Sequence, residues 1–269
     1  MNFSISKTIL SVACAAISVS ALAGTADIKA SNNQAGIQFI STDVNYKETG
    51  NGTVGAAGVT MDTENGRVPG VALSASAMKD LWLGNDYIEA EYSRNSGHTN
   101  YVGAAQGGVF GSARQSDGAT IIDYHLRYGK GFIMGAGLML TPYGEIGHHN
   151  WDRNVNLGET YTNYYYGIGV LGQYSPVEKL VLSANGLIGR TAKSNIDVTG
   201  FGSARLGNSN LYRIGVSADY ALTQNIHANA GVDYTSFDYS ASAIQPGAWA
   251  EPDSTSRYTT VKVGLGYTF

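Results

Sequence analysis

The chain has 269 residues and a formal net charge of −4, which argues against nucleic acid as a partner. Only 14% of its residues are charged, whereas it contains 35 Gly and 18 Tyr. Low charge with abundant glycine and tyrosine favours an all-β protein with aromatic belts at two membrane interfaces. Cys14 is the single cysteine, so a disulfide within the chain is excluded.

The first residues predict a secretory signal peptide. A positively charged start (residues 1–7) precedes an apolar run (8–20) and the small residues Ala21-Leu22-Ala23 of a cleavage site. The apolar run is shorter than the ~20 residues that a spanning helix needs. It also continues past Cys14, which disfavours lipidation at that cysteine.

Cleavage after Ala23 gives a signal peptide at 1–23 and one barrel domain at 24–269. No later stretch is apolar enough for a transmembrane helix, so a membrane-spanning chain has to cross with strands. The mature domain then has no cysteine, and it contains no phosphate loop, nucleophile elbow or zinc motif. We therefore expect no cofactor and no metal.

The mature sequence reads as a series of segments in which apolar and polar residues alternate, as in half-buried β-strands. A polar leader at 24–33 precedes them. Ten such segments are predicted, at 34–46, 71–77, 87–94, 121–128, 138–149, 161–174, 180–190, 211–220, 226–239 and 258–269. We expect a bulge or strand start at Pro142 and a bulge near Phe237, where the apolar parity breaks. A barrel of eight strands is the alternative.

The connections between these segments alternate in length. Long polar loops are predicted at 47–67, 94–119, 191–210 and 240–257, and tight turns at 83–86, 175–179 and 222–225. The connection at 129–137 is an exception, because it is longer than a tight turn. Outer-membrane barrels alternate in this way, with short periplasmic turns and long outer loops.

The last segment has one apolar and one small or polar face. Val263, Leu265, Tyr267 and Phe269 share the apolar face, and the chain stops on an aromatic residue. A soluble β-sandwich would also have short alternating strands. It would not need a secretory signal, regular loop alternation or a terminal aromatic residue.

Three stretches carry a resemblance to a known group of proteins: the signal end 21–23, the segment 140–147 and the tail 263–269. The chain resembles the small outer-membrane β-barrels of Gram-negative bacteria, the group containing the OmpA transmembrane domain and the opacity adhesins. The resemblance implies a closed, antiparallel, up-and-down transmembrane β-barrel in the bacterial outer membrane. It also implies outer-membrane lipid and the barrel assembly machinery as partners, with Val263, Leu265, Tyr267 and Phe269 as the assembly signal.

Charged and polar residues on the predicted inner faces form a candidate lumen network. Its members are Glu89, Glu91, Asp123, His125, Arg127, Glu145, Arg213, Asp219, Asp233 and Lys262. The hairpin register predicts Glu89 beside Arg127 and Glu91 beside His125. Because charges shielded from water need partners, we expect this network to plug a narrow lumen.

The pair Asp123-x-His125 also has the residue types of general base catalysis. Outer-membrane proteases of the omptin type use ten strands and an aspartate–histidine pair, but at the outer rim. No matching outer aspartate pair is evident here, so no catalytic residue is assigned.

A second stretch of interest is His148-His149-Asn150-Trp151-Asp152. Neighbouring residues on a strand point to opposite faces, so the two histidines are not expected to share a metal ion. We interpret Trp151 as an interface anchor. The run Tyr161, Tyr164, Tyr165 and Tyr166 is interpreted as part of an aromatic belt.

These patterns favour a non-enzymatic outer-membrane barrel whose long loops contact an extracellular ligand, as in adhesins. A small-solute channel is one alternative, and it needs a lumen wide enough for water. An omptin-like hydrolase is the other, and it needs a nucleophile–base pair at the rim or at the lipid face.

Overall fold

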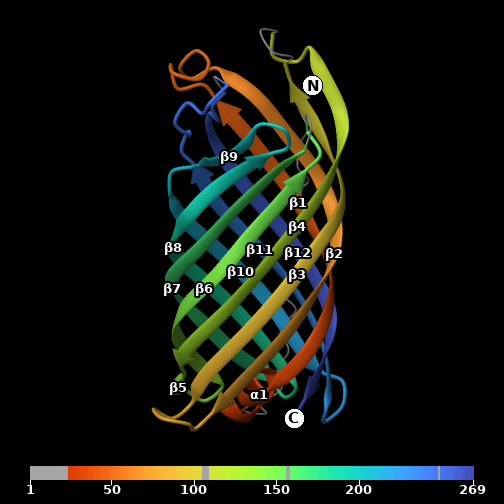
Figure 1. The fold of residues 1–269 in the computed structure, drawn as a ribbon. Helices are drawn as coiled ribbons and strands as arrows, with labels where there is room; N and C mark the ends of the chain where they lie inside the picture. The colour runs from red at the N-terminus through yellow and green to blue at the C-terminus, as the bar shows by residue number, and fades with distance from the viewer. Residues whose placement is uncertain (1–23, 105–108, 156–157, 248) are drawn as a thin grey trace.

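The computed structural model describes residues 24–104, 109–155, 158–247 and 249–269; the predicted signal peptide at 1–23 lies outside them. Ten long antiparallel strands form a closed barrel, as predicted (Figure 1). They are β1 (Gln34–Thr49), β2 (Thr60–Lys79), β3 (Asp86–Gly103), β4 (Ala113–Lys130), β6 (Leu138–Arg153), β7 (Glu159–Val177), β8 (Leu180–Val198), β10 (Asn210–Ala221), β11 (Ile226–Tyr239) and β12 (Asp253–Thr268). Each pairs with the next, and β12 pairs with β1 to close the ring.

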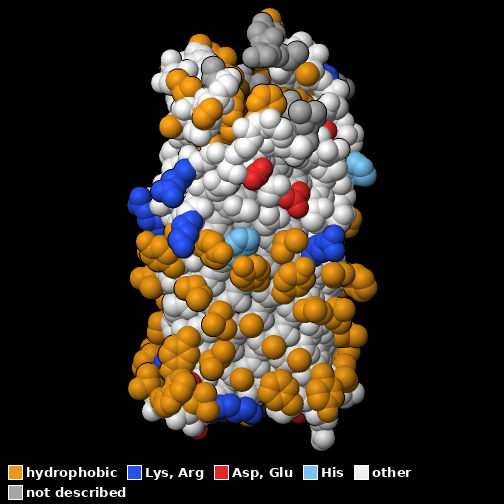
Figure 2. All heavy atoms as spheres, viewed as in Figure 1, with side chains coloured by type: hydrophobic (Ala, Val, Ile, Leu, Met, Phe, Trp, Pro, Cys, Tyr) orange, Lys and Arg blue, Asp and Glu red, His pale blue; other side chains and the backbone are white. Residues whose placement is uncertain are grey.

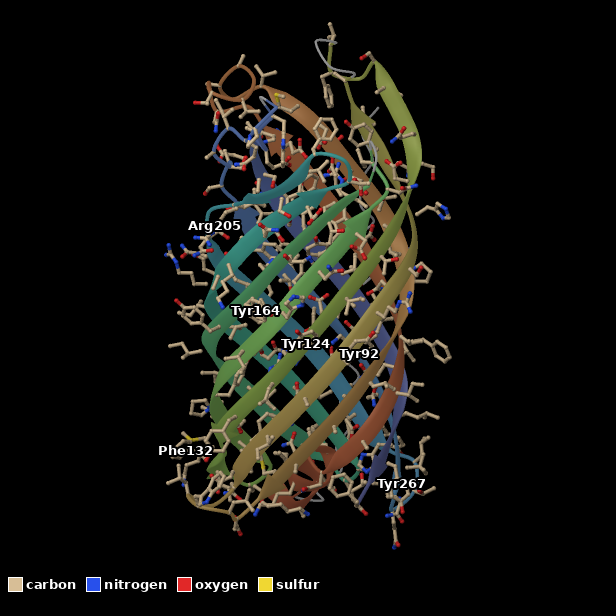
Figure 3. The ribbon with its side chains drawn as sticks, viewed as in Figure 1. Tyr92, Tyr124, Phe132, Tyr164, Arg205 and Tyr267 are labelled. Atoms are coloured by element: carbon tan, nitrogen blue, oxygen red, sulfur yellow. The ribbon has the colours of Figure 1, made fainter. Side chains whose placement is uncertain are left out.

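An exposed apolar belt surrounds one half of the barrel wall (Figure 2). On β1, for example, Ile37 and Phe39 point outward with 52% and 76% of their surface exposed. Figure 3 shows Tyr92, Tyr124 and Tyr164 along one border of this belt and Phe132 and Tyr267 along the other. An apolar band between two aromatic girdles matches the hydrocarbon core of a bilayer and its two interfaces.

The strands are longer than predicted. β2 has 20 residues and β7 has 19, whereas a tilted transmembrane strand needs about 10. The barrel wall therefore continues beyond the belt, on the side of the long connections. Segments predicted as loops are strand there, namely 47–49, 60–67, 95–103, 113–119, 191–198 and 253–257.

The loop predictions failed because the side-chain pattern inverts where the wall leaves the belt. Along β1, Val44 and Tyr46 face inward with 2% and 1% exposure, while Asp43, Asn45 and Lys47 face outward. The Phe237 side chain is likewise buried inside the barrel, and the β11–β12 register passes through this residue without a shift. The bulge predicted at Phe237 is therefore wrong.

Pro142 also lies in regular strand, where a bulge or strand start was predicted. It pairs with Val170 on β7 without a register shift. On its other side, the β4 pairing reaches Tyr143, and the short strand β5 (Phe132–Gly135) begins to pair only at Leu140. Pro142 thus sits at the junction between β4 and β5, where its missing N–H removes no ladder bond.

The predicted polar leader instead forms a helix, α1 (Thr25–Ser31), across the lower end of the barrel (Figure 1). Ile28 is completely buried. Asn32 donates to Gln173 Oε1 at 2.6 Å, and Gln173 donates back at 3.1 Å. The Asn33 side chain accepts from the Met78 N–H at 3.1 Å and donates to the Met78 carbonyl at 3.3 Å. These contacts hold α1 as a plug. No helix in the described residues is long and apolar enough to cross a membrane.

Trypsin treatment of intact cells tests whether the segments around Arg67 and Arg94 are strands, as observed, or loops, as the sequence predicts. Arg67 and Arg94 lie within β2 and β3, whereas the connection 50–59 contains no Lys or Arg. We expect trypsin not to cut after Arg67 or Arg94 and proteinase K to cut within 50–59, because exposed loops are the preferred sites of proteolysis. Heat-unfolded protein, as a control, should be cut after Arg67. Cleavage after Arg67 or Arg94 on intact cells would contradict the extended wall.

Candidate functional site

The lumen at the level of the belt holds a network of ion pairs centred on Arg127. Its guanidinium donates from Nη1 to Glu89 at 2.7 Å and from Nε to Glu145 at 2.6 Å. Glu145 also accepts from Arg213 Nη1 at 2.6 Å, across the barrel. The β3–β4 register pairs Glu89 with Arg127 and Glu91 with His125, as the hairpin predicts.

Glu91 and His125 are paired in the backbone register, but their side chains contact other residues. Glu91 forms its ion pair with Lys262 Nζ at 2.8 Å, across the lumen, and Lys262 also reaches Asp233 at 3.1 Å. His125 contacts Glu89 at 3.2 Å instead of Glu91. The lumen thus contains charges of both signs in direct contact, which offsets their desolvation.

Two histidine–aspartate pairs complete the network. His149 Nδ1 lies 2.8 Å from Asp123, and His227 Nδ1 lies 2.5 Å from Asp219. Asp123 therefore pairs with His149, which the sequence analysis did not assign to the network, and not with His125. Both pairs point into the barrel interior.

The predicted network surrounds an interior cavity of about 250 Å³. Ser31 and Asn32, at the end of the α1 plug, line its lower end. At its other end lie His149, Phe237 and Tyr258, with ring centroids 5.2 to 5.9 Å apart. α1 lies below the cavity, and the aromatic rings lie above it.

Beyond the belt, the wall encloses a second cluster, which we call the crown cluster. It consists of Tyr46, Glu48, Asp62, Glu64, Trp151, Arg153, Tyr161 and Glu251. Arg153 is fully buried at its centre, 2.9 Å from Glu64 and 3.2 Å from Glu48 and Asp62. Its guanidinium also lies 4.8 Å from the ring centroid of Tyr46 and 5.2 Å from that of Trp151, so cation–π attraction adds to the ion pairs.

The crown cluster corrects two predictions. Trp151 and Tyr161 were interpreted as interface residues, yet both are completely buried inside the barrel. Tyr165 also faces inward, whereas Tyr164 and Tyr166 are exposed on the belt as predicted. The sequence analysis missed Arg153 because it lies beyond the predicted fifth strand. A continued period of two through residues 149, 151 and 153 would have placed it inside.

His148 faces outward, opposite to His149, as the strand geometry predicts. Its ring stacks on Tyr124 with centroids 4.9 Å apart and meets Tyr164 edge-on at 4.8 Å. Within the described part of the chain, no group of three or more His, Cys, Asp or Glu side chains could hold a metal ion.

The hydrogen bonds of the crown cluster predict that one of its carboxyl groups is protonated. Glu48, Tyr46, Tyr161 and Glu251 form a row of oxygen atoms joined by three hydrogen bonds: Tyr46 to Glu48 at 2.8 Å, Tyr46 to Tyr161 at 2.9 Å, and Tyr161 to Glu251. The two hydroxyl groups supply only two protons for three bonds. The third proton belongs to Glu48 or Glu251. Burial, reinforced by Glu48, raises the pKa of Glu251 well above its usual range, which favours Glu251 as its holder.

The side chains that occupy the lumen predict negligible steady conductance for the purified protein in planar bilayers. Deleting residues 25–31 removes only the lower plug, so that variant should also stay closed, because the ion pairs and the crown cluster remain. Stable open channels of large conductance in the unmutated protein would contradict this and favour a porin.

The raised carboxyl pKa values predict that stability falls as pH rises. Burial raises the pKa of Asp62, Glu64 and Glu251 in the folded protein. Above the unfolded carboxyl pKa of about 4, the folded state therefore binds more protons than the unfolded state, and deprotonation favours unfolding. Glu251→Gln keeps a hydrogen-bonding group but cannot ionise, so its unfolding free energy should fall less steeply between pH 4 and 9 in urea titrations. The exposed control Glu178→Gln should parallel the unmutated protein; equal slopes for Glu251→Gln would contradict the assignment.

Comparison with known proteins supports the fold. No family model and no curated protein matches the sequence. The structure is similar to the outer membrane protease OmpT of Escherichia coli, with a TM-score of 0.53 and 12% identity over 88% of this chain and 96% of that one. The Yersinia pestis attachment invasion locus protein Ail (TM-score 0.33, 11% identity, 88% and 99% covered) and the P. putida toluene transporter TodX (0.38, 9%, 91% and 92%) are more remote and support no conclusion. The closed ten-stranded wall, its exposed apolar belt and its two aromatic girdles identify this chain as a bacterial outer-membrane β-barrel protein.

Proposed function

We propose that this barrel is a non-enzymatic surface protein that holds its outer loops above the membrane to bind a macromolecular ligand, as adhesins do. The observation that carries the proposal is that side chains fill most of the barrel interior. From α1 to the crown cluster, the described interior is occupied by packed or paired side chains that build the wall. Only a cavity of about 250 Å³ remains between α1 and the aromatic rings, which leaves little room for a solute.

The second support is the rigid extension of the wall. Above the belt, the strands enclose a core of aromatic rings around Arg153, and this core reaches the β11–β12 connection. The Tyr161 hydroxyl is hydrogen-bonded to Glu251 in that connection, and Ser242 Oγ accepts from the Glu251 N–H at 2.9 Å. Preorganised loops lose less conformational entropy on binding. A closed, rigid extension therefore suits recognition better than transport.

The third support is the character of the loop tips. Val109, Phe201 and Ile244 have 79%, 56% and 64% of their surface exposed, each on a different connection. Figure 2 shows apolar side chains gathered at this end of the molecule, separated from the belt by a mostly polar wall. Exposed apolar groups away from the bilayer are typical of protein interaction sites.

The omptin-like alternative gains no support from the histidine–aspartate pairs. His149–Asp123 and His227–Asp219 both lie inside the barrel, where α1 and the aromatic rings prevent a large substrate from reaching them. The similarity to OmpT extends to the fold alone.

Binding of ligand-coated surfaces by intact cells tests the proposal. Cells that display the protein should adhere to at least one member of a panel of matrix proteins, host cells and bacterial cells, and cells without it should not. The triple variant Val109→Ser, Phe201→Ser, Ile244→Ser should lose this adhesion, because the apolar contact area is removed. Lys47→Ala, on the exposed wall below the tips, is the matched control and should adhere normally. Equal adhesion with and without the protein across the panel would contradict the proposal.

A further inference from the structure

We propose that one side of the barrel carries a binding site for a phosphorylated lipid of the outer leaflet. The site combines an apolar groove on the belt with Arg190 at the outer end of that groove and with Lys193 and Arg205 beyond it. It is separate from the loop tips and does not depend on the proposed function.

The groove lies on the membrane-facing surface of β4, β6, β7, β8 and β10 and has a volume of about 830 Å³. It exists because Gly144 contributes no side chain: a Cβ at this position would meet nothing within 4 Å. Its apolar walls are formed by Leu126, Tyr128, Ile146, Tyr166, Ile168, Ile188 and Tyr212. A channel with apolar walls in the hydrocarbon region fits an acyl chain.

At the outer end, the groove reaches Arg190, which lies between Tyr166 on β7 and Asn210 on β10. Lys193 follows on the same strand. Arg205, on the short strand β9 (Gly202–Arg205), pairs its backbone with β8 at Asn195. Figure 3 places Arg205 just above Tyr164, and Figure 2 shows basic side chains grouped at the upper border of the belt on this side.

A break in the strand brings Lys193 to this surface. A regular strand would point residues 190 and 193 to opposite faces. Between β7 and β8, however, the register shifts at this level, and Lys193 adopts a φ of 53°. Its Nζ consequently lies 5.8 Å from the ring centroid of Tyr164, an outward residue of the belt. A non-glycine residue at positive φ costs free energy and is often retained where it aims a side chain.

These cations have no anionic partner in the described residues. Arg190, Lys193 and Arg205 are exposed and form no ion pair there. The only acid on β8 and β9 is Asp197, which accepts a hydrogen bond from Ser203 at 2.7 Å. By contrast, the exposed Arg67 elsewhere on the wall is paired with Asp43 at 2.9 Å.

The position of the cations next to the groove indicates which class of ligand would bind. Three unpaired cations at the level of the outer headgroups complement phosphate groups, and the groove below them accommodates an attached chain. A phosphorylated lipid satisfies both features with one molecule, whereas a free phosphate would use only the cations.

Lipid binding to the purified, folded barrel in detergent tests the site, with bisphosphorylated lipid A as the probe and native mass spectrometry as the readout. The triple variant Arg190→Gln, Lys193→Gln, Arg205→Gln should bind at least about tenfold more weakly, since one charge-assisted contact alone accounts for about that factor. Gly144→Leu should also weaken binding, because it fills the groove without changing any charge. Arg94→Gln, a single cation that follows Tyr92 at the border of the belt on β3, is the control and should bind normally.

Chemically dephosphorylated lipid A and inorganic phosphate distinguish the contribution of the cations from that of the apolar groove. We expect the dephosphorylated lipid to bind weakly, and phosphate to compete only at concentrations far above that of the lipid. Unchanged binding in the triple variant, or equal binding of the dephosphorylated lipid, would overturn the proposal. Full competition by phosphate at the lipid's own concentration, or an unaffected Gly144→Leu variant, would overturn the role of the groove.

Discussion

Every backbone amide in the membrane part of this protein needs a hydrogen-bond partner within the wall, because hydrocarbon offers none. The pairing of β12 with β1, together with that of β8 with β10, closes the ring and leaves no free edge. Closure also fixes the alternation of side chains, because each residue must face either the lumen or the surroundings. The lumen contents, the belt and the loop positions all depend on this constraint.

The narrow interior restricts what can face inward. Some large side chains fit only because a glycine lies beside them: a Cβ at Gly147 would overlap the Tyr165 ring, and a Cβ at Gly169 would overlap the Tyr143 ring. Charged groups are accepted only with partners, as Arg127 shows by bonding Glu89 and Glu145 together. The same pairs that stabilise the wall therefore fill the lumen. This filling of the lumen is the basis on which we propose a role in displaying loops instead of conducting solutes.

The wall passes through two environments, and its polarity changes between them. In the bilayer the outside is apolar and the inside is polar; beyond it, the inside is aromatic and the outside is polar. The crown cluster is the core of this second part, and its ratio of acidic to basic side chains differs from that of the lumen. Several carboxyl groups surround the single guanidinium of Arg153. Burial raises the pKa of three of them, Asp62, Glu64 and Glu251, so we expect the stability of this part to depend on pH.

The sequence by itself determined the strand number, the position of each belt strand and the register of the β3–β4 hairpin. It could do so because residues such as Val263, Leu265 and Tyr267 face lipid, and a period of two with one apolar face is a strong local signal. It did not determine the length of the strands or the plug formed by α1. Above the belt, polar residues such as Asn45 and Lys47 face water, so the segment resembles a loop although the ladder continues.

Only the tertiary structure decided which residues meet across the barrel. The contacts of Arg127 with Glu89 lie within one hairpin and follow from its register. Those of Glu91 with Lys262, and of Arg153 with Glu64, join strands far apart in the chain. Their meeting depends on the tilt and stagger of the closed wall, which no local pattern encodes. The hydrogen-bonded row from Glu48 through Tyr46 and Tyr161 to Glu251 has the same origin, because only the folded ring brings its three distant segments together.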